Sequence, residues 1–439
     1  MSEKKKIEIV FIIQGQERGQ KDIDHYLPFL YFLSKSENLN YTAKGIIFDS
    51  KINFSKYIDA RFTSLSELKN IELEFLYEEN LLDKIKKLLT FKSNLKLVKF
   101  LNKLINKIFT NLSKFKNKNI NWKKKLGENF LYSNLPFIFT TNGNNNELNF
   151  VSHFKKLNIK TKWIVLPHGT IVCDNTMVLE TDLDKNEKIK HEKTIEEIDY
   201  FLKTSKRDKE NEVSRGAKTD KTFVIGSPRY CKEWIEIKSN LQLDGEDVKV
   251  NGKYNVKILF LVPKKHINIF SDELVRTIDF ISKYEEIELI LVSNESHLPK
   301  IPVHIANRKN IRQYYIAEKY STSKLIDWSD IVIHAGTGVI FESFVKEKIT
   351  VLPRYLSANT LISDKYGAGF NLSNRDELRT LLNASVISLN NLKDTYKQKC
   401  ELTNKKFIDE FVYANTESVP QNIVETISVI SDNFKTSKR

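Results

Sequence analysis

The second half of the chain contains the run Ser329-Asp-Ile-Val-Ile-His-Ala-Gly-Thr-Gly-Val-Ile-Phe-Glu-Ser-Phe-Val-Lys-Glu-Lys-Ile-Thr-Val-Leu-Pro353. The β-branched residues at 331–333 predict a strand, Gly336-Thr337-Gly338 predicts a sharp turn, 339–346 has helical apolar spacing, and 349–352 predicts a second strand. Such a unit presents free N–H groups at a helix N-terminus, which suits a phosphate. Glu342 lies one turn into the helix, within reach of a ribose diol. The run therefore predicts binding of a nucleotide phosphate ester.

Length and composition indicate a globular protein of two domains. The chain has 439 residues, of which 41% are hydrophobic and 29% charged, so a disordered chain is excluded. Three widely separated cysteines, Cys173, Cys231 and Cys400, form no CxxC pair. This argues against a disulfide framework or a zinc site and favours a reducing cytoplasm. The apolar run at 7–13 predicts a first strand rather than a signal peptide, and no run approaches the ~20 residues that span a bilayer.

The net charge of +14 is concentrated in one segment. Between Lys84 and Gly127 there are 14 lysines and no Asp or Glu, and without them the chain is close to neutral. Apolar residues recur there at helical spacing, so the segment predicts a basic amphipathic helical insertion at 78–127 that contacts an anionic membrane surface. The alternative is a packed helix with a solvated lysine face. Nucleic acid is not an expected partner, because the rest of the chain has no nucleic-acid-binding motif.

Strands and helices alternate along the chain, which predicts parallel βαβ units in an α/β fold. In the first half we expect strands at 7–13, 43–48, 137–140, 163–166 and 222–225, and helices at 25–33 and 147–157. Residues 180–220 are polar and predict a surface excursion with one helix near 195–202. In the second half we expect strands at 256–262, 287–292, 311–315, 331–333 and 349–352, helices at 272–284 and 321–328, and a helical tail from 378.

The segment 240–255 lacks an apolar period and contains Asp244-Gly245 and Asn251-Gly252, which favours a domain boundary. The predicted domains are therefore 1–240, with the basic insertion, and 256–390, followed by C-terminal helices at 391–439. Ligands of open parallel sheets bind at the carboxyl ends of the strands. Residues that follow strands are therefore the candidates for chemistry.

In the second domain these candidates suit a nucleotide donor. The turn Gly336-Thr337-Gly338 and Glu342 come first, and His334, at the end of the preceding strand, is either a ligand contact or a core histidine. Lys264 and Lys265 follow the strand at 256–262, where cations neutralise charge on a departing phosphate. The alternative for both lysines is a solvated loop.

In the first domain the candidates suit catalysis and an acceptor. His168 follows a predicted strand and is placed for general-base work, or else is a turn histidine bonded to backbone. Asp174 would orient His168 or act itself, and Asn142 and Glu147 follow the preceding strand. Further candidates for an acceptor site are Gln14, Gly15 and Arg229, the last within the turn Gly226-Ser-Pro-Arg229.

The chain resembles bacterial cell-surface polysaccharide glycosyltransferases of the two-domain GT-B architecture. The resemblance depends on His168-Gly169, on Gly226-Ser-Pro-Arg229 and on the unit Ser329–Pro353. It extends to the CDP-glycerol glycerophosphotransferase-like and capsule Kdo/sialic-acid transferase-like groups. It implies two Rossmann-like domains facing a cleft, with the donor on the second domain, the acceptor on the first, and Glu342 on the ribose. No metal-binding DxD motif follows a strand, so metal-independent chemistry without a cofactor is expected.

These observations predict a cytoplasmic enzyme, peripheral at the inner face of the plasma membrane. It would move a sugar from a CMP- or UDP-sugar to a growing, lipid-linked surface glycan such as capsule or O-antigen. The alternatives are a polyol-phosphate transferase, a nucleotide-sugar 2-epimerase-like enzyme, and a non-catalytic lectin-like or scaffold protein. The polyol-phosphate transferase is disfavoured because Gly336-Thr337-Gly338 stands where the glycerophosphotransferases that the chain resembles have a pair of serines. The sequence does not determine the sugar, the linkage, the stereochemical outcome or the oligomeric state.

Overall fold

The computed structural model describes residues 5–13, 19–37, 39–50, 60–77, 136–141, 143, 145–157, 161–169, 172–173, 194–263, 268–293, 301–315 and 320–436. The chain divides into two compact units. Unit 1 comprises Met1–Leu27 and Ser34–Val165, and unit 2 comprises Pro28–Leu33 and Leu166–Arg439.

A seven-stranded sheet contains all five strands predicted in the first half of the chain. Its order is β3-β2-β1-β4-β5-β6-β7, and the pairs β1–β2, β1–β4, β2–β3, β4–β5 and β6–β7 are parallel. The sequence did not predict β3 or β6. The strand bounds are β1 Lys5–Ile13, β2 Leu39–Ser50, β3 Ile71–Tyr77, β4 Pro136–Thr140, β5 Lys162–Val165, β6 Tyr200–Lys203 and β7 Thr222–Val224.

A six-stranded, wholly parallel sheet lies in unit 2 and has the order β10-β9-β8-β11-β12-β13. This is the doubly wound order, with its switch point between β8 and β11. The five strands predicted there are confirmed, and β13 was not predicted. The bounds are β8 Val256–Leu261, β9 Ile287–Ser293, β10 Ile311–Tyr315, β11 Ile331–His334, β12 Ile349–Pro353 and β13 Phe370–Leu372.

The central strands of this sheet are mostly apolar because both faces are covered. Ile258 and Phe260 face one cluster of buried side chains, whereas Leu259 and Leu261, between and beyond them, face another. Alternate residues of a strand point to opposite faces, so a strand buried on both sides loses the polar alternation of a half-exposed one. This explains why short continuous apolar runs identified these strands in the sequence.

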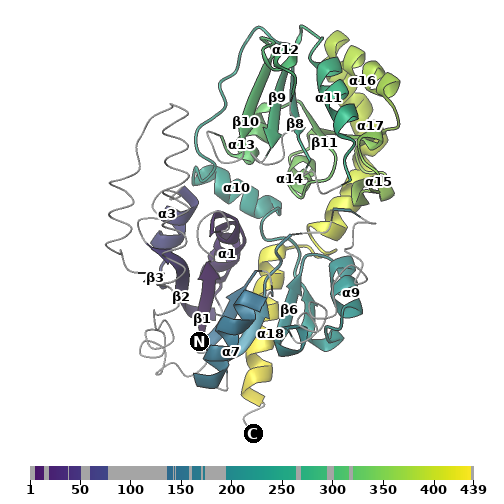
Figure 1. Ribbon diagram of the computed structural model, residues 1–439. Coiled ribbons are helices and arrows are strands. Elements are labelled where there is room, and N and C mark those ends of the chain that lie inside the picture. The colour runs from purple at the N-terminus through teal and green to yellow at the C-terminus, as the bar shows by residue number, and fades with distance from the viewer. Residues whose placement is uncertain are drawn as a thin grey trace, which may run out of the picture. The chain divides into compact units, whose positions relative to one another are not determined.

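Helices follow most of the strands (Figure 1). The predicted helical tail is confirmed as α16, α17 and α18. The helices are α1 Gly19–Ser34, α3 Ala60–Glu67, α7 Asn145–Leu157, α9 Lys206–Ser214, α10 Lys232–Asn240, α11 Ser271–Ile281, α12 Val303–Ala306, α13 Thr322–Trp328, α14 Ile340–Val345, α15 Ile362–Lys365, α16 Arg375–Ile387, α17 Leu389–Phe411 and α18 Val419–Thr436.

The prediction for the polar segment 180–220 was wrong in two respects. The expected helix near 195–202 is a single turn at 194–197, and the chain then forms the strand β6. The charged residues that follow form α9, whose first turn is capped by Ser205, since its hydroxyl accepts a bond from the Asp208 N–H at 3.1 Å. Local capping therefore established a helix where an apolar periodicity was absent.

The predicted basic helical insertion at 78–127 lies outside the described residues. Among the helices that the structure describes, none has both the length and the apolar character needed to cross a membrane.

Candidate functional site

The turn that joins β11 to α14 presents three backbone amides that find no acceptor among the residues the structure describes. Ile340, Phe341 and Glu342 donate to the carbonyls of residues 337, 338 and 339. The N–H groups of Thr337, Gly338 and Val339 themselves find no acceptor among the described residues, and all three residues are only half-buried. Successive free amides of this kind form a concave site for an anion. Helix α14 has only six residues, so these amides contribute more to the attraction of an anion than the helix dipole does.

Gly336 and Gly338 differ in whether the backbone conformation requires a glycine. Gly336 has a φ of 108°, a conformation that a side chain strains. Gly338 is not in that region, and a Cβ placed there would lie 3.8 Å from the nearest atom, the Tyr230 hydroxyl. Neither backbone nor packing therefore demands glycine at 338. With respect to the described residues, the space beside Gly338 is open.

Tyr230, which was not predicted from the sequence, borders Gly338, and it packs beside Arg229, which was predicted for an acceptor site. The Tyr230 ring packs on Phe341 at 5.9 Å between centroids, and the Arg229 guanidinium lies 5.2 Å from the centre of the Tyr230 ring. Tyr230 therefore links the Arg229 guanidinium to the packing around α14. Arg229 was a candidate because it lies in the turn that begins at Gly226. No sequence pattern indicated that residue 230 would lie next to residue 338.

The inner side of the turn is closed. A hollow of about 10 Å³, room for a single water, is enclosed there by Val172, His334, Gly336, Thr337, Ile340, Phe341, Leu361, Ile362, Ser363 and Phe407. His334 is 1% exposed, and burial lowers its pKa to about 3. It is therefore neutral at physiological pH, and its Nδ1 accepts a long bond of 3.5 Å from the Gly336 N–H. Among the described residues, this hollow is too small for anything larger than a water molecule.

Glu342 belongs to a buried ionic cluster. Its Oε1 accepts from the Lys238 Nζ at 3.1 Å, from the Lys346 Nζ at 3.0 Å and from the Ser323 hydroxyl. Burial by itself raises the pKa of the Glu342 carboxyl, but the two ammonium groups and the Ser323 hydroxyl outweigh it and lower the pKa to about 2. Glu342 is therefore an anion at every pH at which the protein would work. The sequence predicted Glu342 but none of its three partners.

Of the catalytic residues predicted in the first half of the chain, the structure describes His168 and Glu147. His168 follows β5 and is exposed. Glu147 is buried, and its Oε2 accepts from the Gly143 N–H at 2.6 Å at the start of α7. The predicted residues Asp174, Asn142, Gln14, Gly15, Lys264 and Lys265 lie outside the described residues.

A buried acidic group that the sequence analysis missed lies in unit 1 beside the switch point between β1 and β4. Asp22, in the first turn of α1, accepts from the Thr141 hydroxyl at 3.0 Å, directly after β4. Burial raises the pKa of the nearby Tyr26 hydroxyl, and the charges of Asp22 and Glu147 raise it further. Two carboxylates and a phenol thus share this edge of the sheet.

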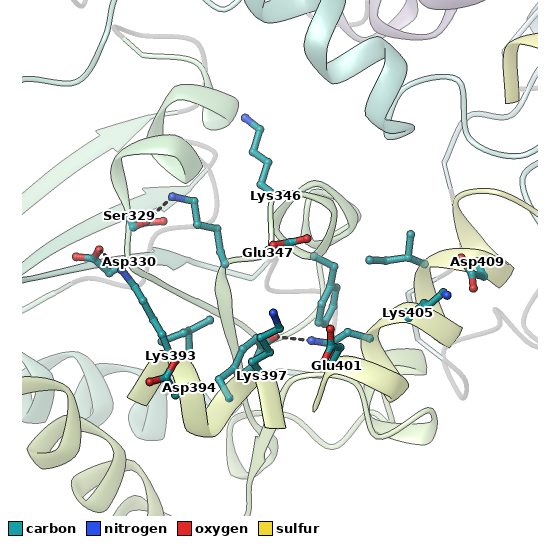
Figure 2. A pocket seen from close by; sticks show the side chains of 16 residues that line it. Ser329, Asp330, Lys346, Glu347, Lys393, Asp394, Lys397, Glu401, Lys405 and Asp409 are labelled. Carbon is teal, nitrogen blue, oxygen red and sulfur yellow. Dashed lines mark hydrogen bonds and ion pairs between the residues drawn. The ribbon is translucent and has the colours of Figure 1, made fainter. Parts of the chain in front are cut away.

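A larger groove lies at the other end of the second sheet (Figure 2). It has a volume of about 620 Å³ and is lined by residues before β11, by the loop from α14 to β12, and by α17. Lys393 is turned toward Asp330 there, 3.7 Å away, and the Lys348 Nζ donates to the carbonyls of Asp327 and Ser329 at 2.9 and 2.8 Å. Because this is the amino end of the strands, and its charges are mixed, it is a poor nucleotide site.

Within the described ranges, no three His, Cys, Asp or Glu side chains converge as metal ligands would. The expectation of metal-independent chemistry stays a prediction.

Comparison with known proteins identifies the architecture. No family model and no curated protein matches the chain, but solved structures do. HepE from Anabaena, in complex with UDP and glucose, matches over 96% of this chain and 100% of its own, with 13% identity and a TM-score of 0.53. UDP-GlcNAc 2-epimerase from Neisseria meningitidis, bound to UDP-GlcNAc, matches over 92% and 99%, with 12% identity and a TM-score of 0.52. The predicted fold class, two Rossmann-like parallel sheets in a GT-B-like chain, is confirmed.

Proposed function

We propose that this protein is a glycosyltransferase that takes a sugar from a nucleotide-activated donor, with the nucleotide bound at the β11–α14 turn. The observation that carries the proposal is the set of free amides at 337–339, followed one turn later by the buried anion Glu342. The amides suit the phosphates, and the carboxylate suits the ribose hydroxyls. The matched structures support UDP as the first nucleotide to test, since their complexes contain UDP or a UDP-sugar.

The chemistry of transfer requires negative charge to be stabilised on the leaving nucleotide. In this proposal the amides of the turn and the guanidinium of Arg229 act on that charge, because fixed donors in a site that excludes water need no reorganisation during reaction. His168 remains the proposed general base toward the acceptor hydroxyl. The acceptor is proposed to be a growing surface glycan.

A nucleotide-sugar 2-epimerase is the second candidate function. The observation that favours it is the buried pair Asp22 and Glu147 beside Tyr26 in unit 1. Proton removal and return at a sugar carbon needs two such acid–base groups, and two of the matched structures are UDP-GlcNAc 2-epimerases. An epimerase needs no acceptor, and this difference separates the two functions experimentally.

The decisive experiment has a binding stage and a reaction stage. Thermal shifts with UDP, CMP, CDP and GDP should show a selective rise in melting temperature with one nucleotide, UDP by our proposal. UDP-sugars are then incubated with the protein, with and without bacterial surface glycan. Release of UDP only with the glycan supports the transferase, whereas a changed sugar without release of UDP supports the epimerase. The absence of any nucleotide-dependent shift would refute both.

Peripheral membrane association is part of the same proposal and depends on the 14 lysines between Lys84 and Gly127. Sedimentation with phosphatidylglycerol vesicles, decreasing as salt rises, is the expected result. Equal sedimentation with neutral vesicles would exclude the electrostatic attraction.

A further inference from the structure

The three donors to Glu342 all converge on one of its two carboxylate oxygens. Lys238 reaches it from α10, Ser323 from α13, and Lys346 from the end of α14. Its other oxygen, Oε2, accepts no hydrogen bond from any residue that the structure describes. A carboxylate has acceptor capacity at both oxygens. The described donors therefore all bind Oε1, and Oε2 remains able to accept a further hydrogen bond.

The donors are held in place independently of Glu342. The Lys238 Nζ also binds the Asp244 carboxylate at 3.2 Å, and the Lys346 Nζ also binds the Asp327 carboxylate at 2.8 Å. Figure 2 shows Lys346 directed away from the residues of α17. Each ammonium group is thus anchored by a second carboxylate. The two anchored ammonium groups therefore limit the side-chain rotamers that Glu342 can adopt.

Stability alone does not account for this cluster. Burying charges costs solvation that mutual attraction only partly returns, and well-packed apolar residues are often as stable or more so. The cluster joins Glu342 to two lysines, each of which has a second carboxylate partner. Glu342 lies in the first turn of α14, three positions after the N-cap residue Val339.

We propose that Lys238 is a positioning residue for the nucleotide, which holds Glu342 so that Oε2 faces the ribose hydroxyls. This inference rests on the proposed function, because it assigns a ribose to the same site. Lys238 itself contacts no ligand. It fixes the orientation of the carboxylate and keeps it ionised. Ser323 assists by donating to the same oxygen.

The test compares UDP with 2′,3′-dideoxy-UDP, which lacks the ribose hydroxyls. Isothermal titration calorimetry measures the dissociation constant of each for wild type, Lys238→Met and the matched control Lys232→Met. Lys232 lies on the same helix, where it is exposed and pairs with Glu236 at 3.9 Å. Lys238→Met should weaken UDP binding by about 10-fold or more and dideoxy-UDP binding by less than about 3-fold. Lys232→Met should change neither.

Three outcomes separate the possible failures. Equal weakening of both ligands by Lys238→Met would mean a purely structural role and would overturn the inference, as would unchanged binding of UDP. If Lys238→Met does not fold, Ser323→Ala provides the same comparison, and a smaller but still hydroxyl-dependent loss is expected. If wild type binds neither UDP nor any other nucleotide, the proposed function itself fails, before the role of Lys238 is in question.

Discussion

Two glycine-containing turns follow strands of unit 2, and the space around their glycines differs. A Cβ on Gly226, after β7, would lie 2.8 Å from the Val412 carbonyl oxygen and 2.7 Å from Val419 Cγ2, and Gly226 has a φ of 81°. A Cβ on Gly338, after β11, would meet its first neighbour at 3.8 Å. In the sequence both glycines follow the end of a strand, but of the two only Gly226 is required by the fold itself.

The difference indicates how a glycine that the fold requires can be distinguished from one that borders a ligand site. At Gly226 the chain passes so close to the loop between α17 and α18 that the Ser227 N–H donates to the Val412 carbonyl at 2.7 Å. That glycine is explained by backbone packing. At Gly338 the same residue type borders free amides and open space, which is the arrangement expected where a phosphate approaches the backbone.

The largest expected effect is on stability, at the packed turn. Gly226→Ala should lower the free energy of unfolding by about 2–4 kcal/mol, because it combines a left-handed φ with a clash against backbone. Gly245→Ala is the matched control, since Gly245 has a φ of 76° but nothing within 4 Å of its added Cβ. It should lose only about 1 kcal/mol. Urea unfolding followed by circular dichroism gives both values, and equal losses would mean that the packing at Gly226 is unimportant.

The sequence predicted the second sheet better than the first for a physical reason. Strands such as β9 and β11 are buried at every position, so a continuous apolar run identifies them. β6 has only four residues, of which two are buried, and its polar neighbours conceal it. β3 begins with apolar and acidic residues in alternation, as Ile-Glu-Leu-Glu-Phe-Leu-Tyr over 71–77, and it was not predicted.

The candidate site shows a similar division. The glycine turn and Glu342 were predictable because strand, turn and helix are adjacent in the chain. Lys238 and Tyr230 were not, because each meets the site only through tertiary packing, across a separation of 104 residues in the pair Lys238–Glu342. Single-sequence patterns carry local periodicity, and they carry no information on which distant helices become neighbours.

An effect of intermediate size on the free energy of unfolding is expected from the protonation of His334, the last residue of β11. Its pKa is about 3 in the folded protein against about 6.5 when unfolded, so the unfolded chain binds the extra proton between these values. Stability is fully present above pH 6.5 and is lost as the pH falls toward 3. Between pH 7 and 5 this amounts to about 2 kcal/mol. Glu342, with its pKa near 2, adds a similar loss only below about pH 4.5.

The measurement is the slope of unfolding free energy against pH for wild type and His334→Gln. The variant should lose most of the slope between pH 7 and 5, whatever its absolute stability. His304→Gln, at an exposed position, should retain the wild-type slope. A slope unaltered by His334→Gln would mean that the side chain is solvated, and the inner wall of the turn would then be more open than described.

The smallest expected effect on stability is at Gly338, and it tests the comparison most directly. Gly338→Ala should change the free energy of unfolding by less than about 0.5 kcal/mol, since its methyl group meets only the Tyr230 hydroxyl at 3.8 Å. It should nevertheless weaken UDP binding by about 10-fold or more, because the methyl group occupies the space through which a phosphate reaches the free amides. Gly252→Ala, with nothing within 4 Å of its added Cβ, is the control and should alter neither quantity. Calorimetric titration with UDP and urea unfolding on the same preparations decide the matter. Wild-type affinity in Gly338→Ala would remove the turn from the nucleotide site, and a stability loss as large as that of Gly226→Ala would make Gly338 a second packing glycine.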